Sequence, residues 1–465
     1  HLRLTLPSIW MEIQIKTPST NVYGVSLPGI QGVVIGFNEN IAWSQTNVGR
    51  DILDWYTIDW KDNKKEEYKY GDTYRKATMK VEKYQVRDSS VIYDTVRYTH
   101  YGPVAYLAKN ANEKDMAMQW MAHKTPIVNE LMVFPMLNKA TNYEEYQKAL
   151  MNYAGPAQNF VFAARDGDVA LWAPGTFPLK APEQGRFVME GSNPDNEWHG
   201  TIPHEHSPFT YNPTRGFVAS ANQETTAPNY PYYYQGSFPT YRGRYLNRTL
   251  RTMDSVTIKD MMNLQQDVHS LLAEEALPVM LENLNTDHLS TEGKKYLKDI
   301  KYWNYRYDRD SIHGAIFDEW LGELKHLVWD EFKGQNKPML SPRVRRMIEI
   351  MKEDPTFSYF DIAHTKDTIE TLPDLVTKAF HEATLILQGM RNDQRQDVKW
   401  GNYKTTKISH LARIEQFSIN TFVGGSRNAL NANSERNGPS WRMVVDMGKE
   451  VKGYASYPGG QSGNP

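Results

Sequence analysis

The sequence has 465 residues, of which 40% are hydrophobic and 23% charged, a composition typical of a globular protein. This length is sufficient for about three domains. Its formal net charge of −2, with no run rich in Lys or Arg, gives no electrostatic basis for binding nucleic acid. The absence of cysteine excludes disulfides, thiolate metal sites and a cysteine nucleophile, and no apolar run approaches the ~20 residues of a membrane span.

The first half of the chain has the pattern of β-strands. The segments VVIGF (33–37) and IAWS (41–44) flank a polar turn, which predicts a hairpin. Residues 91–101 alternate between two faces until Gly102-Pro103 breaks the pattern. In residues 159–173 two apolar runs are joined through Asp166-Gly167, a preferred tight-turn pair, so we expect a second hairpin there.

After about residue 255 the apolar residues recur at helical spacing. We expect one helix capped by Ser311 and a second helix further on. The residues with helical spacing are Phe317, Leu321, Leu324 and Val328 in the first, and Leu375, Val376, Ala379, Phe380, Ala383 and Leu387 in the second. Pro278, Pro338 and Pro373 are expected to separate helices. A strand returns at 440–447, and this order of elements predicts an α+β fold with sheet and helix layers.

The common nucleophile, zinc and phosphate-binding motifs are missing from the sequence. His204-Glu205-His206 is interpreted as a surface loop, because it lies between prolines and no third metal ligand has a diagnostic spacing. Asp51 and Asp54, with a backbone carbonyl between them, could offer oxygen ligands to a hard cation such as Ca²⁺. A solvated loop with capping aspartates is the alternative, and the pattern alone favours it.

Two further polar residues could act in a site. Asn222, after a strand-like run, could donate a hydrogen bond to a developing oxyanion, although an ordinary loop residue is the simpler interpretation. Arg244, in YRGRY, has an ion pair at the surface or in packing as its default role. The 12 Trp, 28 Tyr and 16 Phe are explained by large cores, with a sugar-binding surface as the weaker alternative. These patterns alone indicate an α+β protein and leave its function open.

Taken together and in order, several segments resemble the β-subunit of the penicillin acylase family, which belongs to the N-terminal nucleophile hydrolases. They extend over nearly the whole chain: HLRLTLPSIWMEI (1–13), GVVIGFNENIAWSQTN (32–47), DILDWY (51–56), QNFVFAARDGDVAL (158–171), GFVASANQ (216–223), YRGRY (241–245), GPSWRMVVDM (438–447) and GGQSGNP (459–465). The resemblance implies an α+β fold with a four-layer αββα core.

In that family a precursor cleaves itself, and the new β-chain begins with a serine. The serine hydroxyl attacks an amide while its own α-amine, with a pKa of about 8, acts as general base. The serine begins a Ser-Asn-x-Trp motif shortly before a P-H-L segment, and this chain starts at that histidine. We therefore expect the chain to be an internal piece of a longer protein, inactive alone, with the nucleophile upstream.

The resemblance also implies roles for individual residues. Asn222 matches the asparagine whose carboxamide helps form the oxyanion hole, and Asn47 occupies the position whose backbone N–H supplies the second donor. Arg244 matches an arginine that organises this asparagine and the nucleophile's amine. His1 matches a histidine, found in many acylases, that tunes the amine through a hydrogen bond.

A structural Ca²⁺ and an acyl pocket are implied in the same way. Asp51, Leu53 and Asp54 fall where family members bind Ca²⁺, Leu53 through its carbonyl, with other ligands from an α-subunit of the same precursor. Leu2, Ile35 and Trp120 align with residues that line the acyl pocket, and plain core packing is a nearly equal interpretation.

The expected function is hydrolysis of N-acyl amides, such as β-lactam side-chain amides or N-acyl-homoserine lactones, in the bacterial periplasm or outside the cell. No nucleic acid, membrane span or organic cofactor is expected. The alternative is a non-catalytic binding or scaffold protein on the same fold. The predicted domains are a core in three parts (1–60, 146–255 and 396–465), a β-rich subdomain (61–145) and a helical insertion (256–395).

Overall fold

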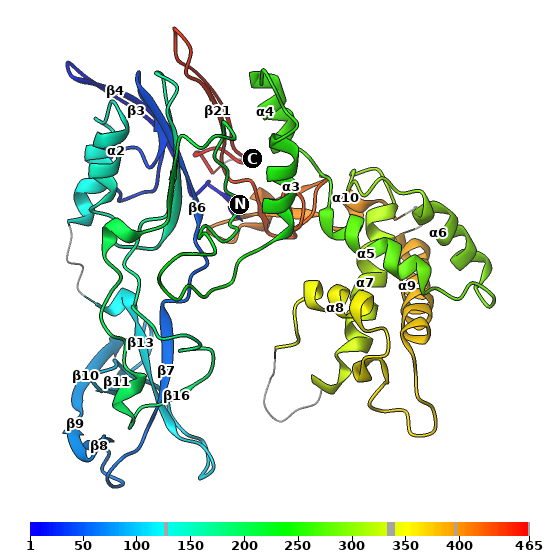
Figure 1. Ribbon diagram of the computed structural model, residues 1–465, viewed down its shortest axis with the longest axis horizontal. Coiled ribbons are helices and arrows are strands. Elements are labelled where there is room, and N and C mark those ends of the chain that lie inside the picture. The colour runs from blue at the N-terminus through cyan, green and yellow to red at the C-terminus, as the bar shows by residue number, and fades with distance from the viewer. Residues whose placement is uncertain (125–128, 333–339, 395–397, 464–465) are drawn as a thin grey trace. The chain divides into compact units, whose positions relative to one another are not determined.

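The computed structural model describes residues 1–124, 129–332, 340–394 and 398–463. The chain divides into two compact units (Figure 1). The first unit contains residues 1–13, 25–30 and 240–465, and the second contains residues 14–24 and 31–239.

A seven-stranded sheet forms the centre of the second unit, and both hairpins predicted from the sequence are part of it. In spatial order its strands are β17 (Phe209–Tyr211), β15 (Val169–Trp172), β14 (Gln158–Ala164), β6 (Ile41–Asn47), β5 (Ile35–Phe37), β4 (Thr20–Ser26) and β3 (Met11–Thr17). Helix α2 (Tyr143–Leu150) packs on this sheet through Tyr146, whose ring centroid lies 4.6 Å from that of Phe162. The short helix α1 (Val133–Leu137) precedes α2. Burial of these aromatic rings fixes the face of the sheet that α2 covers.

This unit contains a second sheet, one strand of which begins at Leu53, two residues after Asp51. Its strands, in spatial order, are β12 (Val104–Tyr106), β13 (Asp115–Trp120), β7 (Leu53–Ile58) and β16 (Met189–Glu190). Two further hairpins pair β8 (Glu67–Tyr70) with β9 (Thr73–Lys76) and β10 (Thr78–Gln85) with β11 (Val91–Tyr98). The strand predicted within residues 91–101 is β11, which ends at Tyr98, four residues before Gly102 with its φ of 143°.

Helices dominate the first unit. Their bounds are α3 (Tyr241–Leu250), α4 (Ile258–Gln265), α5 (Leu271–Glu282), α6 (Thr291–Lys301), α7 (His313–Val328), α8 (Val344–Glu353), α9 (Leu372–Gln394) and α10 (Trp400–Tyr403). Helices α7 and α9 carry the two predicted apolar faces and pack together, with Trp320 Nε1 donating to the Val376 carbonyl at 2.9 Å.

The helix boundaries refine the sequence prediction. The prediction that Ser311 caps a helix is wrong, because α7 begins at His313 and its N-cap is Ile312, which makes no side-chain cap. The Ser311 hydroxyl accepts the N–H of His313 at 3.2 Å from one residue before the cap. Pro373 stands at the start of α9, where the missing N–H costs nothing. The prediction that Pro278 separates helices is wrong, because Pro278 lies inside α5, whose apolar side chains are buried on several sides. Pro338 lies outside the described residues.

Short sheets hold the two ends of the sequence within the first unit. Strand β1 (Leu2–Arg3) pairs with β20 (Asn437–Gly438), and β2 (Thr5–Leu6) pairs with β18 (Thr406–His410), which also pairs with β19 (Ile419–Thr421). The strand predicted at 440–447 is β21 (Arg442–Asp446), paired with β22 (Lys452–Ser456). His1 is therefore placed next to residues that are more than 400 positions away in sequence.

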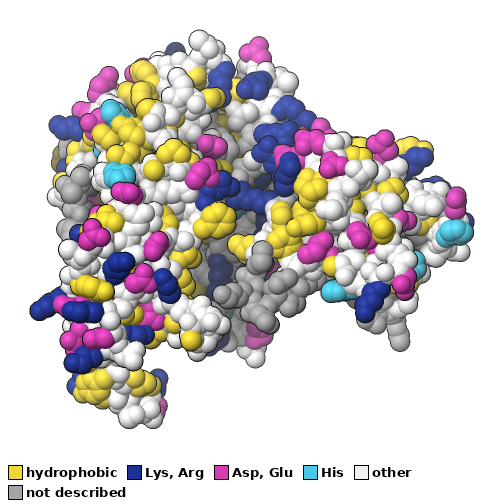
Figure 2. Space-filling model, turned by 60° about the horizontal axis from the view of Figure 1, so that its bottom comes forward, with side chains coloured by type: hydrophobic (Ala, Val, Ile, Leu, Met, Phe, Trp, Pro, Cys, Tyr) yellow, Lys and Arg dark blue, Asp and Glu magenta, His cyan; other side chains and the backbone are white. Residues whose placement is uncertain are grey.

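The surface agrees with the composition. Lys and Arg side chains are interspersed with Asp and Glu side chains on the face shown in Figure 2. Among the helices within the described ranges, none combines the length and the apolar character that crossing a membrane requires.

Candidate active site

Asn222 has a left-handed backbone conformation, with a φ of 67°. Asparagine is one of the few residues other than glycine that adopt this conformation at low cost. The turn around it is held by Gln223, whose carboxamide accepts the Ala221 N–H at 2.6 Å and donates to the Ala219 carbonyl at 2.8 Å. The direction of the Asn222 side chain is thus set by the backbone.

That side chain meets Asn47. The Asn222 Nδ2 donates to the Asn47 carbonyl at 3.1 Å. Asn47 is the last residue of β6, and its carbonyl also accepts from Asn159 Nδ2 at 3.4 Å. Asn159, on β14, is fully buried and donates in addition to Thr46 Oγ1 at 3.2 Å. The structure therefore brings together two residues that the sequence analysis assigned to one oxyanion hole, although it does not test that role.

The chemistry of this group is that of a positioned amide donor. The Asn222 carboxamide nitrogen carries two hydrogens, one of which the Asn47 carbonyl accepts. Asn222 is half-buried and Asn47 is exposed, so a small molecule can reach them from solvent. A donor fixed by its own backbone needs no reorganisation when negative charge develops beside it.

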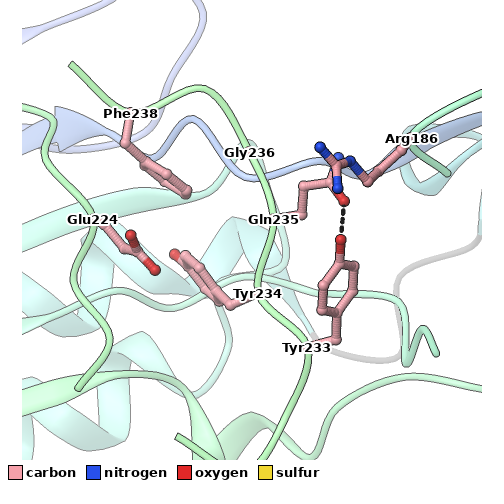
Figure 3. A pocket seen from close by; sticks show the side chains of 7 residues that line it. All are labelled: Arg186, Glu224, Tyr233, Tyr234, Gln235, Gly236 and Phe238. Carbon is pink, nitrogen blue, oxygen red and sulfur yellow. Dashed lines mark hydrogen bonds between the residues drawn. The ribbon is translucent and has the colours of Figure 1, made fainter. Parts of the chain in front are cut away.

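A pocket of about 330 Å³ lies in the same unit, and its lining includes Glu224, two residues after Asn222 in sequence (Figure 3). It is lined by Arg186, Glu224, Tyr233, Tyr234, Gln235, Gly236 and Phe238. Along one side of the pocket, residues 235–237 are hydrogen-bonded to residues 49–51, and the Asp51 N–H donates to the Gln235 carbonyl at 2.8 Å. Tyr234 stacks on Phe238 with ring centroids 5.4 Å apart, and the Tyr233 hydroxyl donates to Gln235 Oε1. The pocket thus combines aromatic walls with groups of both charges.

Asp51 and Asp54 share a lysine. The Lys180 ammonium lies 2.9 Å from Asp51 Oδ2 and 2.9 Å from Asp54 Oδ1. Trp198 Nε1 donates to Asp54 Oδ2 at 2.5 Å, and the Leu53 N–H donates to Asp51 Oδ1 at 3.2 Å. The sequence analysis missed Lys180 and Trp198, because more than 120 residues separate each from Asp54 and neither belongs to a motif.

These residues do not fit a calcium ion. Ca²⁺ takes six to eight oxygen ligands at about 2.3–2.6 Å, and here an ammonium already lies between the two carboxylates. Across residues 1–124, 129–332, 340–394 and 398–463, no three His, Asp or Glu side chains form a group that could hold a metal ion. The space between the carboxylates of the predicted Ca²⁺ site at Asp51, Leu53 and Asp54 is thus taken by the Lys180 ammonium.

His1 lies in the first unit, where its Nε2 accepts the Ala432 N–H at 3.3 Å. Of the charged side chains, those of Arg242 and Arg442 act on the backbone nitrogen of His1. Arg442 is held by the Gln265 carbonyl at 2.9 Å and by Asn431 Oδ1 at 2.7 Å. The surroundings of His1 are therefore cationic.

Arg244 lies on α3 and forms the ion pair that the sequence pattern gives as its default role. Its guanidinium forms two hydrogen bonds with the Glu275 carboxylate, at 2.5 and 3.2 Å, and its side chain is half exposed. The arginine of α3 whose charge acts on the His1 nitrogen is Arg242. Arg242 and Arg244 are two residues apart on α3, so their side chains lie on different faces of the helix. The YRGRY motif alone could not show which of the two arginines acts on His1.

The three predicted acyl-pocket residues lie on separate strands. Leu2 is on β1 and pairs with Gly438, and Ile35 begins β5. Trp120 ends β13 with 37% of its surface exposed, and its ring lies 5.1 Å from that of His123. Ile35 and Trp120 are in different sheets of the second unit, so their shared role in an acyl pocket stays a prediction.

The His204-Glu205-His206 segment forms a short 3₁₀ turn, His204–His206. His204 Nε2 is within 3.2 Å of the Leu150 carbonyl, and His206 Nδ1 within 2.6 Å of the Tyr232 hydroxyl. Both imidazoles thus have partners within the protein.

Comparison with known proteins gives consistent matches. The family model described as penicillin amidase matches residues 1–465. Acyl-homoserine lactone acylase QuiP of Pseudomonas fluorescens is 23% identical over 98% of this chain and 60% of its own length. Penicillin acylase 2 proenzyme of Pseudomonas sp. (strain SE83) is 20% identical over 70% of this chain and 42% of its own length.

The chain thus spans about 60% of the length of the first of these relatives. Among solved structures, a thermostable penicillin G acylase from Alcaligenes faecalis superposes with a TM-score of 0.71 and 18% identity, covering 100% of this chain and 87% of that one. This likeness confirms the predicted α+β fold of the N-terminal nucleophile hydrolases.

Proposed function

Because this chain belongs to the penicillin amidase family, we propose that it supplies the oxyanion-binding residues of an enzyme that hydrolyses N-acyl amides. The observation that carries this proposal is the contact between Asn222 Nδ2 and the Asn47 carbonyl at 3.1 Å. It fixes a carboxamide donor beside the end of β6, where the backbone N–H of Asn47 is the second proposed donor.

In the proposed reaction the nucleophile is a serine located N-terminal to His1 in the full-length protein, exposed by self-cleavage of a precursor. Its hydroxyl oxygen bonds to the amide carbon while its α-amine takes the hydroxyl proton. The carbonyl oxygen gains negative charge, which Asn222 and Asn47 stabilise by hydrogen bonds. The C–N bond then breaks, the amine leaves with the proton, and water hydrolyses the acyl-enzyme.

The substrate class follows from the relatives and from the predicted acyl pocket. The relatives are named for acylases of acyl-homoserine lactones and of penicillin, so we propose N-acyl-homoserine lactones or β-lactam side-chain amides. Because Leu2, Ile35 and Trp120 are apolar, a hydrophobic acyl group suits the pocket better than a charged one. An α-subunit from the same precursor and a periplasmic or secreted location complete the proposal.

The test uses the full-length protein and an Asn222→Asp substitution. Aspartate keeps the size of the side chain and tolerates the left-handed backbone, but its carboxylate cannot donate a hydrogen bond. Loss of one oxyanion donor typically costs about 10²–10³ in kcat, and we expect a decrease of this size with a panel of acyl-homoserine lactones and penicillins.

Asn229→Asp is the matched control, because Asn229 is an exposed loop residue in the same unit. It should leave kcat unchanged. Equal turnover by Asn222→Asp and wild type would contradict the assigned role of Asn222. Sequencing the N-terminus of the mature chain checks the nucleophile separately, and any residue other than serine there would exclude the proposed mechanism.

A further inference from the structure

Every carboxylate oxygen of Asp51 and Asp54 has a hydrogen-bond donor. Asp51 Oδ1 accepts from the Leu53 N–H and Oδ2 from Lys180, while Asp54 Oδ1 accepts from Lys180 and Oδ2 from Trp198. Two carboxylates close together repel each other unless a cation lies between them. In this protein that cation is the ammonium of a lysine from the chain itself.

Two of these three charged side chains, Asp54 and Lys180, are deeply buried. The Asp54 side chain is 0% exposed and that of Lys180 4%, while the Asp51 side chain is 23% exposed. Buried charges require partners of opposite sign. The guanidinium of Arg50, whose charge also interacts with Asp51, lies 4.3 Å from the ring centroids of both Phe177 and Tyr234. The Lys180 ammonium and the Arg50 guanidinium thus balance the charges of the Asp51 and Asp54 carboxylates.

The surrounding chain is built to hold the ammonium in place. Leu179, next to Lys180, exchanges backbone hydrogen bonds with residues 199–200, with the Leu179 N–H donating to the Gly200 carbonyl at 3.0 Å. The Trp198 ring, 5.6 Å from Lys180 Nζ, adds a cation–π contact. At Gly185 a Cβ atom would lie 2.1 Å from Asp54 Oδ1, so the backbone approaches this carboxylate as closely as glycine allows.

We propose that the Lys180 ammonium takes the place of a bound metal ion between Asp51 and Asp54, so that these carboxylates neither bind nor require Ca²⁺. A Ca²⁺ ion bound to both carboxylates would have to occupy the space in which Lys180 Nζ lies 2.9 Å from each. The ammonium would then have to leave or remain beside a like charge. The proposal is independent of the amide hydrolysis proposed above.

The experiment measures thermal unfolding of the full-length protein with EDTA and with millimolar Ca²⁺. The wild-type Tm should be the same in both. Lys180→Met keeps the length of the side chain and removes the charge, so no cation lies between Asp51 and the buried Asp54 carboxylate. We expect its Tm in EDTA to fall by roughly 5–15 °C, and Ca²⁺ to restore part of this loss because the carboxylates are then accessible to a cation.

Lys61→Met is the matched control, because Lys61 pairs with Glu67 at the surface. Its Tm should change by no more than about 2 °C. Three results would overturn the proposal: a wild-type Tm that falls in EDTA, calcium retained by dialysed wild type and lost in Asp51→Asn, or a Lys180→Met variant as stable as wild type. If Lys180→Met does not fold, the two measurements on wild type and Asp51→Asn decide.

Discussion

Asn47 ends strand β6 and Asp51 follows four residues later, yet the polar groups around them are organised in opposite ways. At Asn47 the partners are neutral amides, the Asn222 side chain is half-buried, and Asn47 itself is exposed. At Asp51 the partners are charged, Asp54 and Lys180 are buried, and every carboxylate oxygen has a donor.

The difference separates two uses of polar residues. A group that stabilises a transition state must be reachable and must keep hydrogen-bonding capacity for the substrate. A group that contributes to the folded structure is best fully satisfied within the protein, because an unpaired buried charge is costly. Substitutions around Asn222 should therefore act mainly on turnover, and substitutions around Asp54 mainly on stability.

Of the substitutions that test this contrast, Gly185→Ala is expected to have the largest effect on the free energy of unfolding. The new Cβ would meet the buried Asp54 carboxylate at 2.1 Å, and the φ of 84° disfavours alanine. We expect a loss of roughly 3 kcal/mol or more in the free energy of unfolding. Gly216→Ala is the control, because Gly216 has a similar φ of 74° and nothing within 4 Å. It should cost only about 1 kcal/mol, and equal losses in urea denaturation would contradict the close approach at Asp54.

Two substitutions at Asn222, with smaller effects on stability, separate the contribution of its backbone conformation from that of its carboxamide. Asn222→Ala places alanine at a φ of 67°, which should cost about 1 kcal/mol of stability. Asn222→Gly removes the same carboxamide but suits this backbone, so it should be nearly as stable as wild type. Both variants should lose turnover alike in acylase assays. If Asn222→Gly kept wild-type activity, the site would act through its backbone instead of its carboxamide.

The smallest effect concerns an exposed ion pair of the first unit. Hydrogen bonding to Arg248, aided by His269, lowers the pKa of Glu274 from 4.5 to about 2. A lowered carboxyl pKa contributes stability above the pKa of the unfolded chain, near 4.5, and this contribution is lost as the pH falls towards 2. Because Arg248 is half exposed and Glu274 is partly exposed, Glu274→Gln should cost less than about 1 kcal/mol at neutral pH and still less in acid.

Urea denaturation at neutral and acidic pH measures this loss, with Glu66→Gln as an exposed control. A cost at Glu274 as large as that of removing Lys180 would show that burial is not what separates the two kinds of ion pair.

The elements that the sequence predicted best are those fixed by local pattern. The hairpin around Asp166-Gly167 and the amphipathic helices α7 and α9 depend on spacing within a few residues, and all are present. Pro278 was misjudged because burial of α5 outweighs the lost backbone hydrogen bond. Local preference decides an element only where tertiary packing agrees with it.

The candidate site was predictable in part. The resemblance identified Asn222 and Asn47, and the structure places them in contact. Lys180 could not be predicted, because its pairing with Asp51 depends on the path of a long loop and not on a sequence spacing. Arg242 was overlooked beside Arg244 because the face that each presents depends on where α3 begins.

The buried amide of Asn159 has a consequence for enzyme engineering. Its Nδ2 holds the same carbonyl of Asn47 that accepts from Asn222. A library designed around solvent-accessible residues would omit Asn159, because it is 0% exposed. Varying Asn159 would change the support of the carbonyl against which Asn222 is aligned, and so offers a way to alter the candidate site without changing Asn222 or Asn47.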